Sequence, residues 1–281
     1  MDASLLQRLA LAARQAVGQA GEIIKANWRR PKTVQYKGPR DLLTETDLAV
    51  EQALTVSLAA LLPGAAFLGE ETSGQTGDQT GDPSGDRPGD QSRLLLGLDR
   101  PTWIVDPVDG TTNFAHGLPL VATSVGLWAE GRIQLGIVNL PILDEMFWAV
   151  RGQGAFLGQE RLSVSTAPNL SRGLVATGFP YRIPEFLPEI LRQMEAVLQT
   201  AQGLRRMGAA SVDLAYVACG RLDGFYEFDL KPWDTAAGWL LVEEAGGRVS
   251  RFDALKPYAL GAPTILATNG LIHEEMAAIL A

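Results

Sequence analysis

The sequence has few of the residues that most often carry acid–base or redox chemistry in proteins. Its 281 residues include one cysteine, Cys219, and two histidines, His116 and His273. A single cysteine cannot form an intrachain disulfide, which favours a reducing compartment. The shortage of both residue types argues against a zinc site and against histidine-based catalysis. The sequence also lacks a Walker loop, a CxxC cluster and a Ser-His-Asp pattern.

Positive charge is scarce as well. The chain has 24 lysines and arginines against 32 acidic residues, which gives a net charge of −8 and a pI near 4.9. Its basic runs are no longer than pairs such as Arg29-Arg30, so we expect no nucleic-acid partner. An anionic substrate would need positive charge from another source, and metal ions are one such source.

No stretch of the sequence is long and apolar enough to suggest a membrane segment. The longest charge-free apolar run, residues 117–129, is shorter than the roughly 20 residues that a helix needs to cross a bilayer. The N-terminal segment carries charges at Asp2, Arg8, Arg14 and Glu22, unlike a secretory signal peptide. We therefore expect a cytoplasmic protein that has no membrane partner.

The spacing of apolar residues predicts helices and strands along most of the chain. The first half should contain helices at 4–28 and 46–62, strands at 33–37 and 65–71, and strands joined by hairpin turns between 103 and 165. The second half should contain strands at 174–179, 224–230, 248–252 and 264–269, with helices at 184–201, 209–220, 233–247 and 271–280. We interpret this order as an α+β or α/β protein whose two sheets are covered by helices.

Residues 72–93 do not fit this pattern. The segment has no aliphatic or aromatic residue and repeats Gly-Asp every four residues from position 77 to position 90. Because it cannot offset its ordering entropy by burial, we predict a disordered surface loop. Calcium binding is the alternative, but the segment lacks the EF-hand pattern of acids and the apolar position of the nonapeptide repeat.

Acidic residues stand at the edges of four apolar elements. They are Asp47 in TETD, Glu70 and Glu71 in LGEE, Asp106 and Asp109 in DPVDGTT, and Asp234 in KPWDTAAG. Taken singly, each could be a helix-capping acid, a solvated loop residue or a turn residue. Taken together, they supply the carboxylate oxygens that Mg²⁺ prefers, with positions left for water and phosphate. This combination favours a cation site built from separate segments.

The DPVDGTT segment has further features that suit a cation and a phosphate. Pro107 fixes one backbone φ angle and Gly110 permits a conformation that a Cβ would resist, so the carbonyl of Val108 can face the same ion as the aspartates. Thr111 and Thr112 follow, where a helix N-terminus or a group of backbone amides would suit a phosphate.

Three motifs of the chain closely resemble those of the inositol monophosphatase family, within the lithium-sensitive, magnesium-dependent phosphatase superfamily. They are GEE at residues 69–71, DPVDGTTNF at 106–114 and WDTAAG at 233–238, with TETD before them and EEAGG after them. The resemblance covers nearly the whole chain. It implies a layered α-β-α-β-α sandwich with two mixed sheets and a single catalytic domain over 1–281, divided into halves at about 1–165 and 166–281.

The resemblance also implies roles for individual residues. Two or three Mg²⁺ ions are expected, with metal ligands at Glu70, Asp106, the Val108 carbonyl, Asp109 and Asp234. Thr111 paired with Asp47 is expected to orient and help deprotonate the attacking water, and Glu70 is a competing candidate for the base. Substrate contacts are expected at Gly110, Thr111, Gly208, Ala210, Glu227 and Asp234.

The substrate implied by the resemblance is a small phosphorylated polyol or sugar. The residues Thr112-Asn113-Phe114 favour inositol monophosphate, because bisphosphate nucleotidases more often have a basic residue where Thr112 stands. Fructose 1,6-bisphosphate or another sugar phosphate is the first alternative, and a 3'(2'),5'-bisphosphate nucleotide is the second. A regulatory binding protein that keeps the fold is the alternative outside enzymes. The resemblance further implies a homodimer.

The chain departs from the family pattern in two places, both on the mobile side of the expected site. Relatives have a much shorter link than residues 72–93 between the Glu-Glu motif and the next strand. Lys37 is the match for the lysine of the family's mobile metal loop, with a gap nearby.

Overall fold

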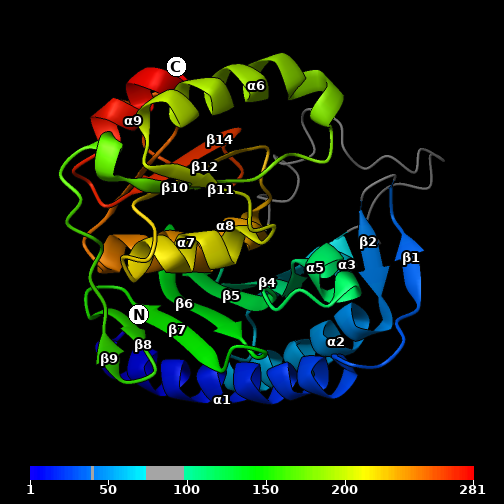
Figure 1. Cartoon of the computed structure of the whole chain (residues 1–281). Coiled ribbons are helices and arrows are strands. Elements are labelled where there is room, and N and C mark those ends of the chain that lie inside the picture. Colours follow the sequence, from blue (N-terminus) through cyan, green and yellow to red (C-terminus); the bar gives the residue numbers. More distant parts are fainter. Residues whose placement is uncertain (39–40, 74–97) are drawn as a thin grey trace.

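A computed structural model describes residues 1–38, 41–73 and 98–281. The chain forms five alternating layers, which confirms the predicted α-β-α-β-α sandwich (Figure 1). Two helices form the first layer, α1 (Ala3–Asn27) and α2 (Glu45–Leu61). The middle helical layer contains α7 (Ala210–Ala218) and α8 (Pro232–Glu244), and the last contains α6 (Ile183–Thr200) and α9 (His273–Leu280).

The larger sheet has seven strands that follow one another in sequence order. Its first two strands are parallel and the others pair antiparallel. Helix α5 lies between β4 and β5, and from β5 onward hairpin turns join the strands, as the turn signals predicted. The strands are β3 (Ala66–Gly69), β4 (Thr102–Asp109), β5 (Ala122–Ala129), β6 (Arg132–Leu140), β7 (Glu145–Val150), β8 (Gly154–Leu157) and β9 (Glu160–Arg161).

The smaller sheet has five strands in the order β11-β10-β12-β14-β13 and is mixed. Strand β10 is parallel to both of its neighbours, whereas β14 is antiparallel to β12 and β13. The strands are β10 (Leu174–Thr177), β11 (Gly203–Arg205), β12 (Gly224–Phe228), β13 (Arg248–Ser250) and β14 (Thr264–Thr268). A separate hairpin of β1 (Val34–Tyr36) and β2 (Leu42–Thr44) stands beside the short helix α5 (Thr111–His116).

Some predicted boundaries were wrong. The strand expected over 65–71 ends at Gly69, and a short helix α3 (Glu70–Ser73) begins there. The first two residues of the predicted 72–93 loop are therefore helical, and the rest of that prediction lies outside the described residues. The patterns also missed β2, β11 and the 3₁₀ turn η2 (Leu170–Arg172), which are each three residues long and too short to show a periodicity.

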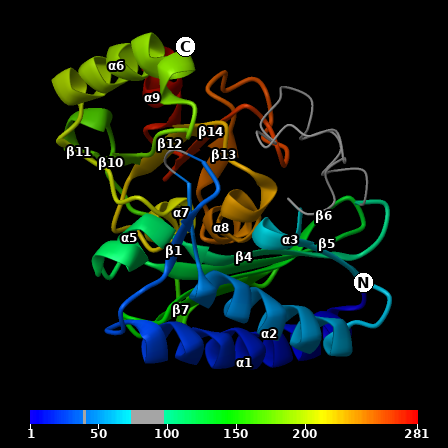
Figure 2. The same cartoon turned by 90° about the vertical axis from the view of Figure 1, so that its right-hand side faces the viewer.

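Helix α1 covers the outer face of the larger sheet. Its apolar residues recur every three or four positions, so one face buries Leu6, Leu9, Ala13 and Val17 while the other faces solvent. Figure 2 shows α1 and α2 side by side under this sheet. In the described part of the chain, no helix is long and apolar enough to span a membrane.

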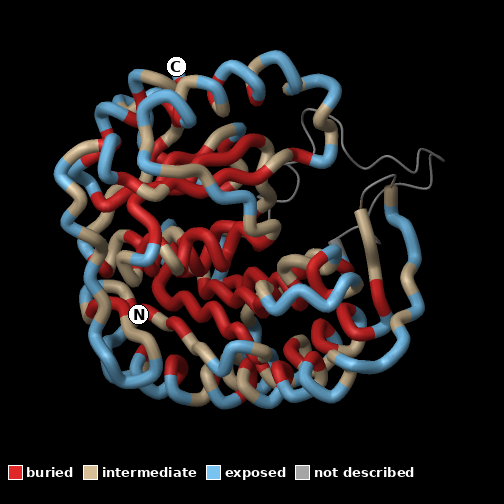
Figure 3. The backbone as a smooth tube through the Cα atoms, in the orientation of Figure 1, coloured by how far each residue is buried: buried red, intermediate tan, exposed pale blue. Residues whose placement is uncertain are grey.

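The strands of the larger sheet bury both faces. On β4, Trp103 and Val105 pack into the core shared with α1 and α2, while Ile104 packs into the core shared with α7 and α8. This alternation explains why most of β4 and β5 is buried (Figure 3). A third core lies between the smaller sheet and the outer helices α6 and α9.

Helix α8 lies unusually close to the larger sheet. Gly126 and Gly136 are paired on the neighbouring strands β5 and β6. A Cβ at Gly126 would lie 2.9 Å from the Ala236 Cβ, and one at Gly136 would lie 2.7 Å from the Ala237 carbonyl oxygen. The paired glycines therefore let α8 settle onto the sheet, and this fixes where its first turn sits relative to β4.

Buried His273 gives the fold a pH-dependent contact. Its Nε2 lies 2.8 Å from Ser250 Oγ and its Nδ1 lies 2.9 Å from Thr268 Oγ1, so the ring joins α9 to β13 and β14. Burial lowers the pKa of His273 to about 4, helped by the charge of Arg248. The unfolded chain then binds more protons than the folded one between about pH 6.5 and 4.

We therefore expect stability to fall as the pH drops through this range, by at most about 3 kcal/mol from this one group. Urea unfolding at pH 7, 6, 5 and 4 should show a shallower pH dependence in His273→Gln than in the unmodified protein. His116→Gln is the matched control because His116 is the other histidine and is exposed. Equal pH dependence in all three proteins would contradict the prediction.

Candidate active site

A bulge in β4 turns Asp106 and Asp109 toward the same side of the larger sheet. Side chains three residues apart on a regular strand face opposite sides. Here the pairing with β5 shifts between these two aspartates, since Asp106 lies opposite Ser124 and Asp109 lies opposite Ala122. Val108 consequently joins the α1–α2 core, and both aspartates face α8. Pro107 fits this place because a bulge leaves a backbone position unpaired.

Strand pairing brings Glu70 beside Asp106. In the parallel β3–β4 pair, Gly69 lies opposite Val105, so the next residues along the two strands are Glu70 and Asp106. Burial raises the pKa of Asp106, and the charge of Glu70 and a side-chain hydrogen bond with it raise this pKa further. The long sequence separation between the two acids therefore does not separate them in space.

Asp47 caps a helix and also contacts Thr111. It lies in the first turn of α2, where its carboxylate accepts from the backbone amide of Thr44 at 2.9 Å and completes a capping box. Its other oxygen lies 3.0 Å from Thr111 Oγ1, and this hydroxyl also lies 2.9 Å from the Val108 carbonyl oxygen. The same side chain thus caps α2 and makes the contact with Thr111 that the expected catalytic role requires.

Gly110 makes the sharp turn from β4 into α5. Its φ of +88° is in the left-handed region, which a residue with a Cβ adopts at a cost. A Cβ at this position would also lie 2.8 Å from the Leu120 carbonyl oxygen. The turn predicted from Asp-Gly is therefore present, and it directs Thr111 toward Asp47.

Asp234 reaches the site from α8 and Asp109 is anchored from α7. Asp234 accepts from the backbone amide of Lys231 at 2.7 Å, which caps α8. Asp109 accepts from the amide and the hydroxyl of Ser211 at 2.7 and 2.6 Å. Both middle-layer helices therefore present their first turns to the acids of β4.

The acids perturb one another electrostatically. Burial raises the pKa of Asp106 well above its usual value, and the charges of Glu70 and Asp109 raise it further. Asp234 is shifted in the same direction by burial and by the charge of Asp109. Burial raises the pKa of Asp109 to about 6, although the hydrogen bonds from Ser211 oppose the shift. Such a group of buried carboxyls needs protons or a cation.

These residues fit a divalent cation chemically but do not form a finished cage. Among the described residues, no three Asp, Glu, His or Cys side chains are arranged so that they could hold a metal ion as they stand. The donors of this group are carboxylates and a carbonyl, which are the hard oxygen ligands that Mg²⁺ takes and zinc sites seldom use alone. A positive ion would also lower the raised pKa values of the buried acids.

Lys37 from the β1–β2 hairpin supplies positive charge to the same group. Its Nζ lies 2.8 Å from Glu70 and 3.0 Å from Glu71, with Asp41 at 3.5 Å. Burial alone would lower the pKa of Lys37, but these acids raise it more. Burial raises the pKa of Glu71 to about 8. Glu71 therefore forms an ion pair with Lys37 and ties α3 to the β1–β2 hairpin.

Four of the expected substrate residues, Gly208, Ala210, Glu227 and Asp234, come from the second half of the chain. A Cβ at Gly110 would lie 3.3 Å from the Ala209 Cβ, so the turn after β4 abuts the segment that contains Gly208 and Ala210. Glu227 on β12 is buried, and a Cβ at Gly178 would lie 2.1 Å from its Oε2. Burial raises the pKa of Glu227 well above its usual value, and Asp234 raises it further.

Four residues near the site were not identified from the sequence. Ser211 anchors Asp109. Asp213 is buried and its Oδ1 has no hydrogen-bond partner among the residues that the structure describes. Arg206 acts electrostatically on both Asp213 and Glu227. Burial and the charge of Asp41 raise the pKa of Tyr181, followed by the charge of Glu70. None of these residues stands in a distinctive motif, and only their contacts reveal them.

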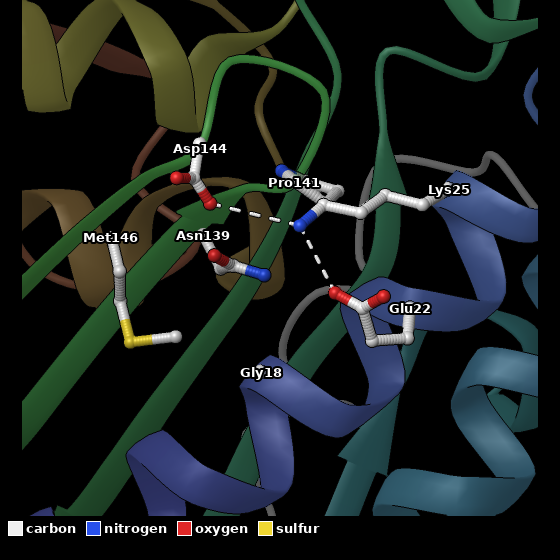
Figure 4. A pocket seen from close by; sticks show the side chains of 7 residues that line it. All are labelled: Gly18, Glu22, Lys25, Asn139, Pro141, Asp144 and Met146. Atoms are coloured by element: carbon white, nitrogen blue, oxygen red, sulfur yellow. Dashed lines mark ion pairs between the residues drawn. The ribbon is translucent and has the colours of Figure 1, made fainter.

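A cavity of about 160 Å³ lies apart from these residues, between α1 and the turn that joins β6 to β7. Lys25 on α1 is paired there with Glu22 of the same helix at 3.0 Å and with Asp144 of the turn at 3.6 Å (Figure 4). A second cavity, of about 250 Å³, lies between α2 and α3 and is lined partly by Glu51 and Glu71. Neither cavity is lined by the four acids that face one another at β4.

Comparisons with known proteins give a consistent result. The sequence model of the inositol monophosphatase family matches residues 5–281. An inositol-1-monophosphatase of Caulobacter vibrioides is 38% identical over 246 residues, which cover 86% of this chain and 88% of that protein. The Nus factor SuhB of Haemophilus influenzae is 36% identical over 265 residues, covering 93% and 92%. The solved structure of the extragenic suppressor protein SuhB from Bartonella henselae gives a TM-score of 0.82 at 35% identity, with 95% of each chain covered.

The buried acids lead to a prediction for the metal-free protein. Asp106→Asn should raise its stability at pH 8, by about 1–3 kcal/mol, because it removes a charge buried among like charges. The raised pKa values mean that the folded state holds protons that the unfolded state has released, so the stability conferred by Asp106 falls as the pH rises. Urea unfolding in EDTA at pH 5 and pH 8 measures this difference.

Mg²⁺ should stabilise the unmodified protein more at pH 8 than at pH 5, and it should stabilise Asp106→Asn less. The matched control is Asp99→Asn, since Asp99 is exposed and should leave both quantities unchanged. A metal-free Asp106→Asn protein that is less stable than the unmodified one would contradict the idea of unrelieved charge.

Proposed function

Because the chain belongs to the inositol monophosphatase family, we propose that it is a Mg²⁺-dependent hydrolase of phosphate monoesters and that its first substrate is inositol monophosphate. The observation that carries the proposal is the convergence of Glu70, Asp106, Asp109 and Asp234 beside the Asp47–Thr111 pair. An acidic protein gathers carboxylates around a phosphate site only if cations are bound there too.

The proposal assigns the ions to the ligands that the family resemblance implies. Glu70, Asp106 and the Val108 carbonyl would hold one Mg²⁺, and Asp106, Asp109 and Asp234 would hold a second. A third ion would be associated with Glu70. When bound, the ions would neutralise phosphate charge, make a water molecule easier to deprotonate and stabilise the leaving oxygen.

The protein groups would position the water and the ester. Thr111 Oγ1 would accept a hydrogen bond from the attacking water while it donates its own proton to Asp47 Oδ1, 3.0 Å away. Burial raises the pKa of Asp47, which makes this carboxylate a better proton acceptor. Glu70 is the competing base. The backbone amides of Gly110 and Thr111 would hold phosphate oxygens.

Buried carboxylates would accept hydrogen bonds from hydroxyl groups of the substrate. Glu227 has no hydrogen-bond donor within the described residues, and its carboxylate is proposed to accept from a substrate hydroxyl together with Asp234. An acceptor that is left unpaired in a buried site disfavours analogues without that hydroxyl. Gly208 and Ala210 would border the same part of the substrate.

Two alternatives to this proposal are other phosphorylated substrates and a regulatory binding role. Sugar phosphates such as fructose 1,6-bisphosphate, and then 3'(2'),5'-bisphosphate nucleotides, are the alternative substrates within the same chemistry. A regulatory binding role is the alternative outside catalysis, because several similar proteins are named Nus factors. The complete set of candidate catalytic residues favours catalysis. A homodimer in the cytoplasm is also proposed, and light scattering on the purified chain would test the dimer.

A substrate panel tests the proposal directly. Phosphate release should be measured for inositol 1-phosphate, fructose 1,6-bisphosphate and adenosine 3',5'-bisphosphate, each with Mg²⁺, with EDTA, and with Mg²⁺ plus Li⁺. We expect turnover that requires Mg²⁺, is greatest with inositol 1-phosphate and is inhibited by Li⁺. Absence of phosphate release from every substrate would exclude the enzyme and favour the regulatory role.

The proposed role of Thr111 has its own test. Thr111→Val should lower kcat by roughly 100-fold or more, because it removes the hydroxyl that links the water to Asp47 while keeping the size of the side chain. Thr111→Ser keeps the hydroxyl and should recover most of the lost rate. Steady-state kinetics at saturating Mg²⁺ separate the two variants. If the valine variant turned over at more than half the original rate, Thr111 would not act on the water.

A further inference from the structure

Two glycines on helix α1 leave a cavity between this helix and the turn that joins β6 to β7. Gly18 and Gly21 are three residues apart, so they share one side of the helix. A Cβ at Gly21 would lie 2.5 Å from Asn139 Nδ2, so a glycine at this position lets this side chain of β6 lie against α1. At Gly18 a Cβ would lie 3.5 Å from Met146 Cε, and a volume of about 160 Å³ takes the place of a larger side chain.

Asn139 presents a buried amide to this cavity. It lies on the same face of β6 as Leu135 and Ile137, which pack into the core shared with α1 and α2. Only 7% of Asn139 is exposed, and within the described part of the chain its amide neither donates nor accepts a hydrogen bond. The great majority of buried polar side chains have partners, because an unpaired group loses its hydration without compensation. A ligand in the cavity would supply the partner.

Charged groups of both signs form the rim of the cavity. Lys25 Nζ lies 3.0 Å from Glu22 Oε1 and 3.6 Å from Asp144 Oδ1 (Figure 4). The two carboxylates repel an anion and the ammonium repels a cation, whereas a neutral hydroxyl group can donate to a carboxylate and accept from the ammonium or from an amide. Pro141 and Met146 add apolar surface that suits the C–H groups of such a molecule.

We propose that this cavity is a binding site for a small neutral polyol, whose hydroxyl groups would bridge the Asn139 amide and the ion pairs of Lys25. A cavity of about 150 Å³ in another protein holds one benzene molecule, so the volume suits a single ring or a short chain of hydroxylated carbons. The acids of the proposed catalytic site face α8, on the other side of the larger sheet from α1. The two sites are therefore separate, and this inference holds whether or not the chain is a phosphatase.

Titration calorimetry on the full chain with Mg²⁺ tests this site. Polyols stabilise many proteins merely by being excluded from their surfaces, so saturable binding is the decisive signal and a raised melting temperature is not. Erythritol should bind with one molecule per chain, myo-inositol should also bind, and glycine, a small zwitterion, should not. No saturable heat with either polyol would overturn the proposal, and so would binding of glycine alone.

Two substitutions in the cavity locate the bound molecule. Asn139→Leu keeps the size of the side chain and removes the amide, so the Kd for erythritol should rise at least about tenfold. Without ligand this variant should melt at a higher temperature than the unmodified chain, since the amide has no partner to lose. Gly18→Leu should fill the cavity and abolish binding, whereas Gly18→Ala adds only a methyl group and should retain most of it.

Gln19→Leu is the matched control, because Gln19 is an exposed amide on the same helix, and it should leave the Kd unchanged. Unchanged binding in either Asn139→Leu or Gly18→Leu would place the polyol elsewhere and overturn the proposal. A lower melting temperature of ligand-free Asn139→Leu would show that the amide stabilises the fold through a protein partner, and would overturn it too.

Discussion

The contact of α8 with the larger sheet determines whether the site exists. Four small residues meet there, since Gly126 and Gly136 on the sheet face Ala236 and Ala237 on the helix with no room for a further methyl group. Interiors are packed so densely that one added carbon displaces a whole element. A displacement of α8 would carry Asp234 away from β4, because that carboxylate also caps the first turn of the helix. Steric fit between apolar and glycine positions next to the acids therefore helps set the distances between them.

The fold uses much of its stability to keep like charges together. Asp106 is almost fully buried among acids, and its neighbours each raise its pKa. The stabilising contacts lie around this group: a capping box at Asp47, two hydrogen bonds from Ser211 to Asp109, and the Lys37 ion pairs at Glu70 and Glu71. Each contact satisfies one oxygen or one charge and leaves the group short of positive charge as a whole. A bound cation would supply the missing positive charge and so stabilise the folded state.

Much of the fold could be predicted from the sequence because its signals are local. The 3.6-residue period of α1 and the hairpin turns of the larger sheet each depend on a few neighbouring residues. The acidic motifs were recognisable for the same reason. Their mutual geometry was not, because the bulge at Pro107 and the approach of α8 depend on residues distant in the sequence. Asp213 and Arg206 escaped notice since an ordinary helix and loop sequence surrounds them.

The proposed site divides between the two halves of the chain largely according to task. Asp47, Glu70, Asp106, Asp109 and Thr111, which would bind ions and water, come from the half that contains the larger sheet, and Asp234 joins them from α8 in the second half. Gly208, Ala210 and Glu227, which would meet the variable part of a substrate, come from the half that contains the smaller sheet. Substitutions around these three residues can then accumulate while the proposed ion ligands stay unchanged. Such an arrangement lets one hydrolytic core acquire new substrates in separate lineages, with selection acting on a few side chains of one wall.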